Sequence, residues 1–184
     1  MKKFFKSLML ISVCLGLSAT VNAKTFRYAT TGDILGLDPH ANNEGPTNTM
    51  KGNIYGRMLH RKADLSLEPD LATKWEKLDA NTWRFSLRRG VKFHNGNDFN
   101  ADDVLFSYKR QTQEASDMSF ALATIKQINK VDDYTVDLIT KGPDPILLLN
   151  MPMFYIVDKE WIEANNAFEV VRASGSTNFA NVNT

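Results

Sequence analysis

Two parts of the chain alternate between apolar and polar residues, which is the pattern of half-buried β-strands. Residues 82–88 follow residues 75–78 across the polar turn Asp79-Ala80-Asn81, so the pair predicts an antiparallel hairpin with one solvated face. A second hairpin is predicted over residues 124–131 and 134–140, around the turn-favouring pair Asp132-Asp133. The side chains expected on the buried face of the first hairpin are Trp83, Phe85 and Leu87.

Apolar residues at three- and four-residue spacing predict two longer helices. Pro46 suits a first helical turn, and a helix is expected over residues 47–59, ended by the cation-rich His60-Arg61-Lys62. Asn100 is an expected N-cap for a helix over residues 101–111, with Asp103 at the N3 position of a capping box. The expected buried faces are Met50, Ile54, Tyr55, Met58 and Leu59 in the first helix, and Ala101, Val104, Leu105 and Tyr108 in the second.

Shorter elements complete the pattern. Residues 24–30 predict a first strand, and residues 154–157 a buried one. Short helices are expected over residues 71–74, over residues 146–151 and after Asp158. Asp70 and Asp158 are the expected caps of the first and last of these helices. Helices and strands are interspersed, so the chain is assigned to the mixed α/β (α+β) class.

The N-terminus has the three ordered features of a secretory signal. Residues 1–6 are basic, residues 8–17 are mostly apolar, and Val21-Asn22-Ala23 is a small-x-small cleavage pattern. We therefore expect a signal peptide over residues 1–23, cleaved after Ala23, and export to the periplasm. Cys14 is the only cysteine and lies inside the apolar run. Lipidation there is an open alternative, although the preceding Val13 is larger than such sites favour.

Charge and composition exclude several classes of partner. The chain has 22 basic and 21 acidic residues, and removing the three signal lysines leaves 19 basic residues and a net charge of −2. Both signs are mixed along the sequence, so no nucleic-acid-binding patch is predicted. Without Cys14 the chain has no thiol, which excludes disulfides and thiolate chemistry. A monomer is expected.

Catalytic and metal-binding motifs are missing from the sequence. It contains no GxSxG, SxxK, HExxH or P-loop pattern. The three histidines, His40, His60 and His94, lie far apart in sequence, and none has a partner at helical metal-ligand spacing. His94 is interpreted as a turn residue, whereas His40, in the loop after the first strand, is a candidate for ligand contact. We predict no enzyme activity, no catalytic or metal site, and no cofactor.

Several blocks of sequence occur in a characteristic order. They are Leu37-Asp38-Pro39-His40, Pro69-Asp70-Leu71-Ala72, Trp75-Glu76, residues 83–88, residues 90–96 and residues 101–107. Together they resemble the bacterial extracellular solute-binding proteins of family 5. The resemblance covers residues 24 to about 162, and Asn95 departs from it where the family usually has aspartate. These proteins are the dipeptide, oligopeptide and nickel receptors of bacterial ABC importers.

The resemblance implies a periplasmic-binding-protein-like lobe of the class II type. It implies that residues 24–60 start lobe I, that residues 61–172 form its β-rich subdomain, and that residues 173–184 begin a return toward lobe I. Family members are roughly three times longer than one such domain of about 150 residues. We therefore expect this chain to be an N-terminal fragment.

The resemblance also implies a function, a partner and a set of residues on one side of a ligand-binding cleft. The expected function is capture of di- or oligopeptides for an ABC permease in the inner membrane. Nickel, haem or another small solute is the alternative within the family, and an exported hydrolase or an adhesin is the alternative outside it. The candidate ligand-binding residues are Asp33, Asn43, Glu44, Gly45 and Phe120.

Overall fold

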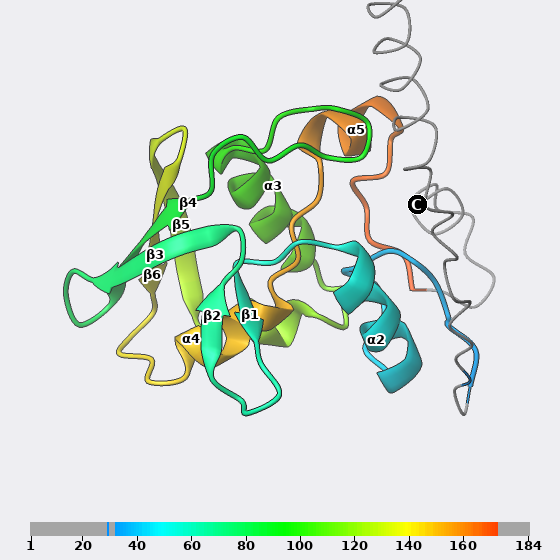
Figure 1. Cartoon of the computed structure of the whole chain (residues 1–184), viewed down its shortest axis with the longest axis horizontal. Helices are drawn as coiled ribbons and strands as arrows, with labels where there is room; N and C mark the ends of the chain where they lie inside the picture. The colour runs from blue at the N-terminus through cyan, green and yellow to red at the C-terminus, as the bar shows by residue number, and fades with distance from the viewer. Residues whose placement is uncertain (1–28, 30–31, 173–184) are drawn as a thin grey trace, which may run out of the picture. The chain divides into compact units, whose positions relative to one another are not determined.

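The computed structural model describes Ala29 and residues 32–172 of the chain (Figure 1). Its larger sheet has four antiparallel strands in the order β3-β4-β6-β5. These strands are β3 (Ala72–Lys77), β4 (Thr82–Leu87), β5 (Ile125–Asp132) and β6 (Thr135–Thr140). A smaller antiparallel sheet pairs β1 (Leu59–Arg61) with β2 (Leu67–Pro69). Both hairpins predicted from the alternating pattern, β3–β4 and β5–β6, are confirmed.

The turn between β3 and β4 shows why the first hairpin forms where it was predicted. The carboxylate of Asp79 accepts hydrogen bonds from the backbone N–H groups of Asn81 and Thr82, at 2.8 and 3.0 Å. Such Asx bonding reverses the chain without help from the rest of the fold. Phe85, in the central strand β4, is fully buried and lies in register with Trp75 on β3 and Val136 on β6.

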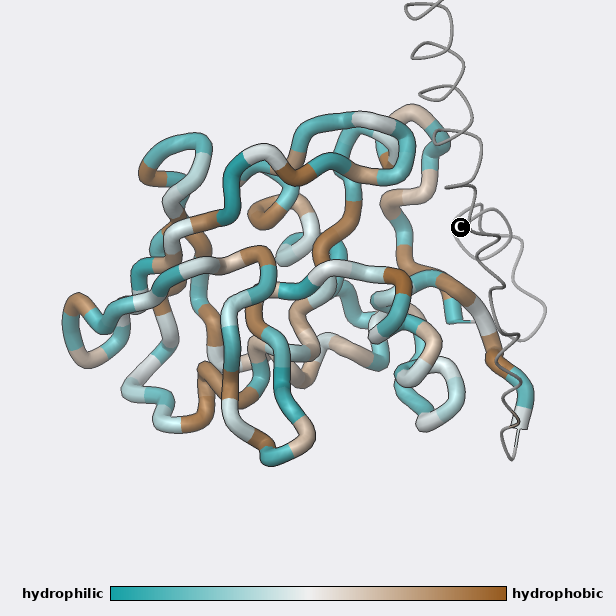
Figure 2. Tube along the Cα trace, in the orientation of Figure 1, coloured by the Kyte–Doolittle hydropathy of each residue, from teal (hydrophilic) through white to brown (hydrophobic). Residues whose placement is uncertain are grey.

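Some helices pack against the larger sheet, and others lie apart from it (Figure 1). They are α2 (Gly45–Ile54), α3 (Ala101–Gln111), α4 (Leu147–Asn150) and α5 (Lys159–Ala164), with 3-10 turns η1 (Ser119–Leu122) and η2 (Met151–Met153). Helix α3 packs beside β5, while α2 lies apart from the larger sheet (Figure 1). Apolar and polar residues are interspersed along the strands, the segment around α4 is strongly apolar, and α2 is mostly pale or polar (Figure 2). Within residues 32–172, no helix is long and apolar enough to cross a bilayer.

Helix α3 confirms its predicted bounds and its predicted cap. The Asn100 side chain accepts a hydrogen bond from the Asp102 N–H at 2.7 Å, and the Asp103 carboxylate accepts one from the Asn100 N–H at 2.9 Å. Ala101 and Val104 are fully buried, as the helical period predicts. The expected cap at Asp158 is also present, since its carboxylate accepts a hydrogen bond from the Trp161 N–H at 3.0 Å.

The prediction for the first helix is wrong in its extent and in its buried face. Helix α2 ends at Ile54, and its buried residues are Thr47 and Lys51, whereas Met50 and Ile54 are 37% and 36% exposed. The helix ends there because Tyr55 is extended, which brings the next residues against another segment. Backbone hydrogen bonds join Met58 to Phe154 at 3.2 Å and Ile156 to Gly56 at 3.0 Å. His60, expected to end the helix, lies in β1 opposite Glu68.

Three smaller predictions have different outcomes. The helical turn expected after Asp70 is wrong, because the chain there forms β3, whose Ala72 pairs with Leu87. The Asp70 carboxylate instead accepts a hydrogen bond from the Arg57 N–H at 3.3 Å. Residues 154–157 are buried as predicted, and Tyr155 forms an isolated antiparallel bridge with Arg57. The strand expected over residues 24–30 lies largely outside the described residues, and Ala29 alone is described there as non-strand.

Replacing Asn100 with alanine is expected to lower the free energy of unfolding by about 1 kcal/mol, because the first turn of α3 loses its side-chain acceptor. Urea denaturation checks this value. The control is Asn129→Ala, at an exposed position on β5, where a change within about 0.5 kcal/mol is expected. Equal effects of the two substitutions would show that the cap contributes nothing specific.

Candidate functional site

The segment before α2 turns inward at Asp38, Pro39 and His40. The Asp38 carboxylate accepts a hydrogen bond from the His40 N–H at 3.0 Å, and the Asp38 carbonyl accepts one from the Ala41 N–H at 3.3 Å. Proline between them fixes its own φ and has no N–H to satisfy. The side chains of Asp38 and His40 are both buried as a result.

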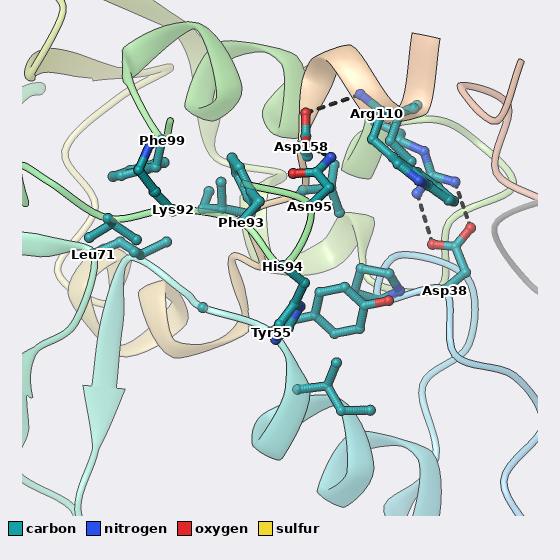
Figure 3. A pocket seen from close by; sticks show the side chains of 18 residues that line it. Asp38, Tyr55, Leu71, Lys92, Phe93, His94, Asn95, Phe99, Arg110 and Asp158 are labelled. Atoms are coloured by element: carbon teal, nitrogen blue, oxygen red, sulfur yellow. Dashed lines mark hydrogen bonds and ion pairs between the residues drawn. The ribbon is translucent and has the colours of Figure 1, made fainter. Parts of the chain in front are cut away.

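Arg110, in the last turn of α3, binds this inward turn. Its Nη1 and Nη2 atoms donate to the two carboxylate oxygens of Asp38 at 2.8 and 2.5 Å (Figure 3). Its Nε atom donates to the carbonyl of Ala167 at 3.1 Å. A bidentate guanidinium–carboxylate pair is geometrically strict, and both side chains here are fully removed from solvent. The pair therefore fixes the segment before α2 to α3.

His40 is held neutral between two partners. Arginine has no acceptor, so the Nδ1 atom of His40 must accept the hydrogen bond from Arg110 Nη1, at 3.1 Å. The proton then lies on Nε2, which donates to the Tyr155 carbonyl at 3.0 Å. Burial and the neighbouring Arg110 charge lower the pKa of His40 to about 3. Burial alone would raise the pKa of Asp38, but the hydrogen bonds and charge of Arg110 lower it below its ordinary value.

Three consecutive backbone carbonyls after this turn each accept a hydrogen bond. The Ser116 hydroxyl donates to the carbonyl of His40 at 2.7 Å, and the Asp117 N–H donates to that of Ala41 at 3.1 Å. The Lys51 ammonium donates to the carbonyl of Asn42. We call residues 38–42 the anchored segment. It is held by α3, by the turn before η1 and by α2.

The candidate residues Asn43, Glu44 and Gly45 follow the anchored segment directly and lead into α2. Asn43 and Gly45 are exposed, and Glu44 is half-buried. Glu44 is the N-cap residue of α2, but its side chain makes no capping hydrogen bond. The Asn43 amide oxygen accepts a hydrogen bond from the Asn48 side chain at 2.7 Å. These three residues therefore form the open end of a loop whose inner end is fixed.

Phe120 and Asp33 lie on other segments. Phe120 is on η1 and is 48% exposed, and the turn that precedes η1 carries the two groups that bind the anchored segment, Ser116 and Asp117. Asp33 is exposed and accepts a hydrogen bond from the Ile34 N–H at 2.8 Å. The structure thus joins residues 43–45 and links the turn before Phe120 to the same loop. It also brings the segment around Asp33 to the start of α2, where the Leu35 N–H donates to the Thr47 hydroxyl at 3.0 Å.

A cavity of about 430 Å³ lies beside the Asp38–Arg110 pair, and both residues contribute to its wall (Figure 3). None of the five candidate residues lines it. Its wall is largely apolar and is drawn from segments far apart in sequence, which is why the sequence pattern gave no indication of it. The segments are residues 38–39, 54–56, 91–95 and 156–158, together with Leu71, Phe99, Arg110, Trp161 and Ile162. His94, interpreted as a turn residue, is exposed and lies at this cavity.

Among residues 32–172, one group of carboxylates is close enough to share a cation, namely Asp103, Asp158 and Glu160, with ligand atoms within 4.8 Å of one another. Asp103 accepts hydrogen bonds from the Asn100 and Lys159 N–H groups, at 2.9 and 3.0 Å. Asp158 accepts one from the Asn95 side chain at 2.7 Å, besides its capping bond. Burial raises the pKa of Asp103 to about 6. Asp103 therefore links α3 to the start of α5, and Asp158 caps α5 and binds the turn at Asn95.

Arg110 and Lys51 are the two residues of this region that the sequence patterns missed. In the sequence, Arg110 is simply a cation near the C-terminal end of a helix, where cations are favoured. The helical period held the missing signal, because Arg110 lies four residues after Phe106 and three after Ser107, both of which are buried. His40 was considered a candidate for ligand contact, and the structure contradicts this, since its side chain is fully enclosed by protein groups.

Residues 66–181 match the family model described as bacterial extracellular solute-binding proteins, family 5, middle region. The chain belongs to this family. It is similar to the dipeptide-binding protein of Escherichia coli, with 32% identity over 176 residues, covering 83% of this chain and 33% of that protein. It is similar to heme-binding protein A of Haemophilus influenzae, with 33% identity over 155 residues, covering 72% and 28%.

The fold also matches solved family 5 structures. One is the periplasmic binding protein DppA of Helicobacter pylori in complex with the peptide STSA, with a TM-score of 0.64 and 29% identity, covering 73% of this chain and 31% of that one. The mixed α/β fold is therefore that of a periplasmic binding protein, as the sequence predicted. The chain spans about a third of the length of the curated relatives that it matches.

Proposed function

We propose that this chain provides one wall of the ligand site in a periplasmic substrate-binding component of an ABC importer, which captures di- or oligopeptides. Its proposed partner is the importer's permease in the inner membrane. The E. coli relative is a dipeptide-binding protein, and the H. pylori structure holds a peptide. In this proposal residues 1–23 direct export, and residues 61–172 form the β-rich subdomain of a first lobe. The component works as a monomer and without catalysis.

The observation that carries the proposal is the contrast between the two ends of one loop. The anchored segment is held through three consecutive carbonyls, while Asn43 and Gly45, just beyond it, are exposed. A loop that is already ordered loses little conformational entropy when a ligand binds. Extended peptides are bound largely through their main chain, which suits an exposed and ordered stretch of backbone. Asp33 and Phe120 are the further proposed contacts of this wall.

A second ligand class is haem, because one relative is named a heme-binding protein. Nickel and other small solutes stay alternatives from the family resemblance. The chemistry differs, since haem and nickel need an axial or chelating ligand such as a histidine. The chain has three histidines. His40 is fully buried, and the Nε2 atom of His60 lies 3.8 Å from a carboxylate oxygen of Glu68. His94 is the remaining candidate for such a ligand. Peptide is the favoured ligand because the E. coli relative is named a dipeptide-binding protein and the H. pylori structure holds a peptide.

Calorimetry on the complete gene product, purified from the periplasm, tests the proposal. The titrants are dialanine, trialanine, haemin and the nickel–histidine complex. Saturable binding of one or both peptides is expected, without turnover of the bound peptide. Saturable binding of haemin or nickel alone would overturn the peptide assignment, and hydrolysis of the peptides would overturn the assignment as a binding protein.

Replacing Phe120 with alanine is expected to weaken peptide binding about tenfold, because the wall loses an aromatic surface that can pack on the ligand. The thermal midpoint is expected to change little, since 48% of the ring is exposed. Val131→Ala is the control, because Val131 is equally exposed at 48% but lies on the β5–β6 hairpin. If both variants bind as the wild type does, Phe120 is not a contact.

A further inference from the structure

A buried lysine lies directly behind the candidate ligand loop. Lys51 is fully buried, and it is one of only two buried residues of α2. Its ammonium donates a hydrogen bond to the carbonyl of Asn42, the last residue of the anchored segment. Lysine is seldom found fully buried, because removing its charge from water is costly unless partners compensate.

The charges around Lys51 offset only part of the cost of burying its ammonium group. Asp38, Glu44 and Asp117 attract its ammonium, from the inward turn, the loop end and the turn before η1 respectively. Arg110 and His40 belong to the same cluster, through their contacts with Asp38 and with each other. Burial outweighs the attractions and lowers the pKa of Lys51 to about 8. The charged form is thus present at neutral pH although burial disfavours it.

A methionine at this position would avoid the loss of hydration that a buried charge incurs, but it would leave the buried Asn42 carbonyl without its donor. What the ammonium provides is a strong, directed donor for the Asn42 carbonyl. The carbonyls of His40 and Ala41 are bound by groups outside α2, so Lys51 is what ties the last anchored residue to the helix.

We propose that Lys51 is a positioning residue for ligand capture, which holds the Asn42 carbonyl inward so that Asn43, Glu44 and Gly45 stay ordered and outward-facing. The inference rests on the proposed function of that loop. Neutralising Lys51 loosens the loop end and weakens ligand binding. The effect on the order of the loop can be measured separately from the effect on ligand affinity, because the loop can be observed with no ligand present.

The first experiment uses NMR on the ligand-free complete gene product between pH 6.5 and 9.5. The peptide group that joins Asn42 to Asn43 accepts the Lys51 hydrogen bond, so the Asn43 amide signal is expected to shift with a midpoint near pH 8. Lys51→Met should abolish this titration, while the amide signals of the β3-β4-β6-β5 sheet stay those of the wild type. The matched control is Lys109→Met, an exposed lysine in the last turn of α3, which should keep the titration.

The second experiment measures dialanine and trialanine affinity of the same variants at pH 7. Lys51→Met is expected to bind about tenfold more weakly than the wild type, and Lys109→Met to bind as the wild type does. If the wild type binds neither peptide, the proposed function fails, while the loop titration still decides the role of Lys51. An unchanged Asn43 titration in Lys51→Met, or wild-type peptide affinity in this variant, would overturn the positioning role.

Discussion

Replacing Arg110 with methionine is expected to lower the free energy of unfolding by about 3–5 kcal/mol, the largest single effect we predict. The substitution keeps most of the side-chain volume but leaves the buried Asp38 carboxylate without its two guanidinium hydrogen bonds. It also removes the donors to His40 and to the Ala167 carbonyl. Urea denaturation monitored by tryptophan fluorescence checks the value.

Arg84→Met is the matched control for the arginine substitution. Arg84 also binds a carboxylate through two hydrogen bonds, from its Nε and Nη2 atoms to Asp137 at 2.7 and 2.8 Å, but this pair lies across β4 and β6, and 35% of the Arg84 side chain is exposed. A partly exposed pair is expected to contribute much less than a buried one. The double variant Asp38→Asn with Arg110→Met should recover part of the loss, because no uncompensated charge remains buried. If the two arginine substitutions lowered the free energy of unfolding equally, burial would not explain the effect at Arg110.

The second large effect is a loss of stability at acid pH through His40. Its pKa is about 3 in the folded protein against an ordinary 6.5, so the unfolded chain binds more protons between these two values. Stability is therefore complete above about pH 6.5 and falls as the pH falls. At about 1.4 kcal/mol for each pH unit, the loss from this group reaches about 3 kcal/mol at pH 4.5.

The measurement compares the wild type with His40→Asn by urea denaturation at pH 7.0 and at pH 4.5. The wild type should lose about 3 kcal/mol more than the variant between these pH values. Asp103 acts in the opposite direction, since its raised pKa of about 6 makes acidification stabilising, but it is present in both proteins and cancels in the comparison. Asp38 loses its charge below this window, because its pKa lies under 3.8. Parallel pH profiles would show that His40 is not held neutral by burial.

Local chemistry was sufficient for a large part of the fold. The Asp79 turn and the alternation in residues 82–88 predicted the β3–β4 hairpin, and the Asn100 and Asp103 pair predicted the start of α3. These elements are determined by hydrogen bonds between near neighbours and by one buried face. The order of the sequence blocks predicted the family, and the match over residues 66–181 confirmed it. The candidate ligand residues stay predictions, and the structure adds that three of them are consecutive at the end of an anchored loop.

The sequence by itself determined the hairpins, the capped helix and the family, because each depends on residues close together in the chain. Only the tertiary structure decided where the first helix ends and which of its faces is buried. That helix ends at Ile54 because the next residues pair with residues 154–156, a contact across about a hundred residues that no local pattern encodes. The roles of Arg110 and Lys51 also depend on contacts that only the tertiary structure shows. A cation looks like a surface residue in sequence, and it becomes an internal anchor only when a distant carboxylate or carbonyl is brought to it.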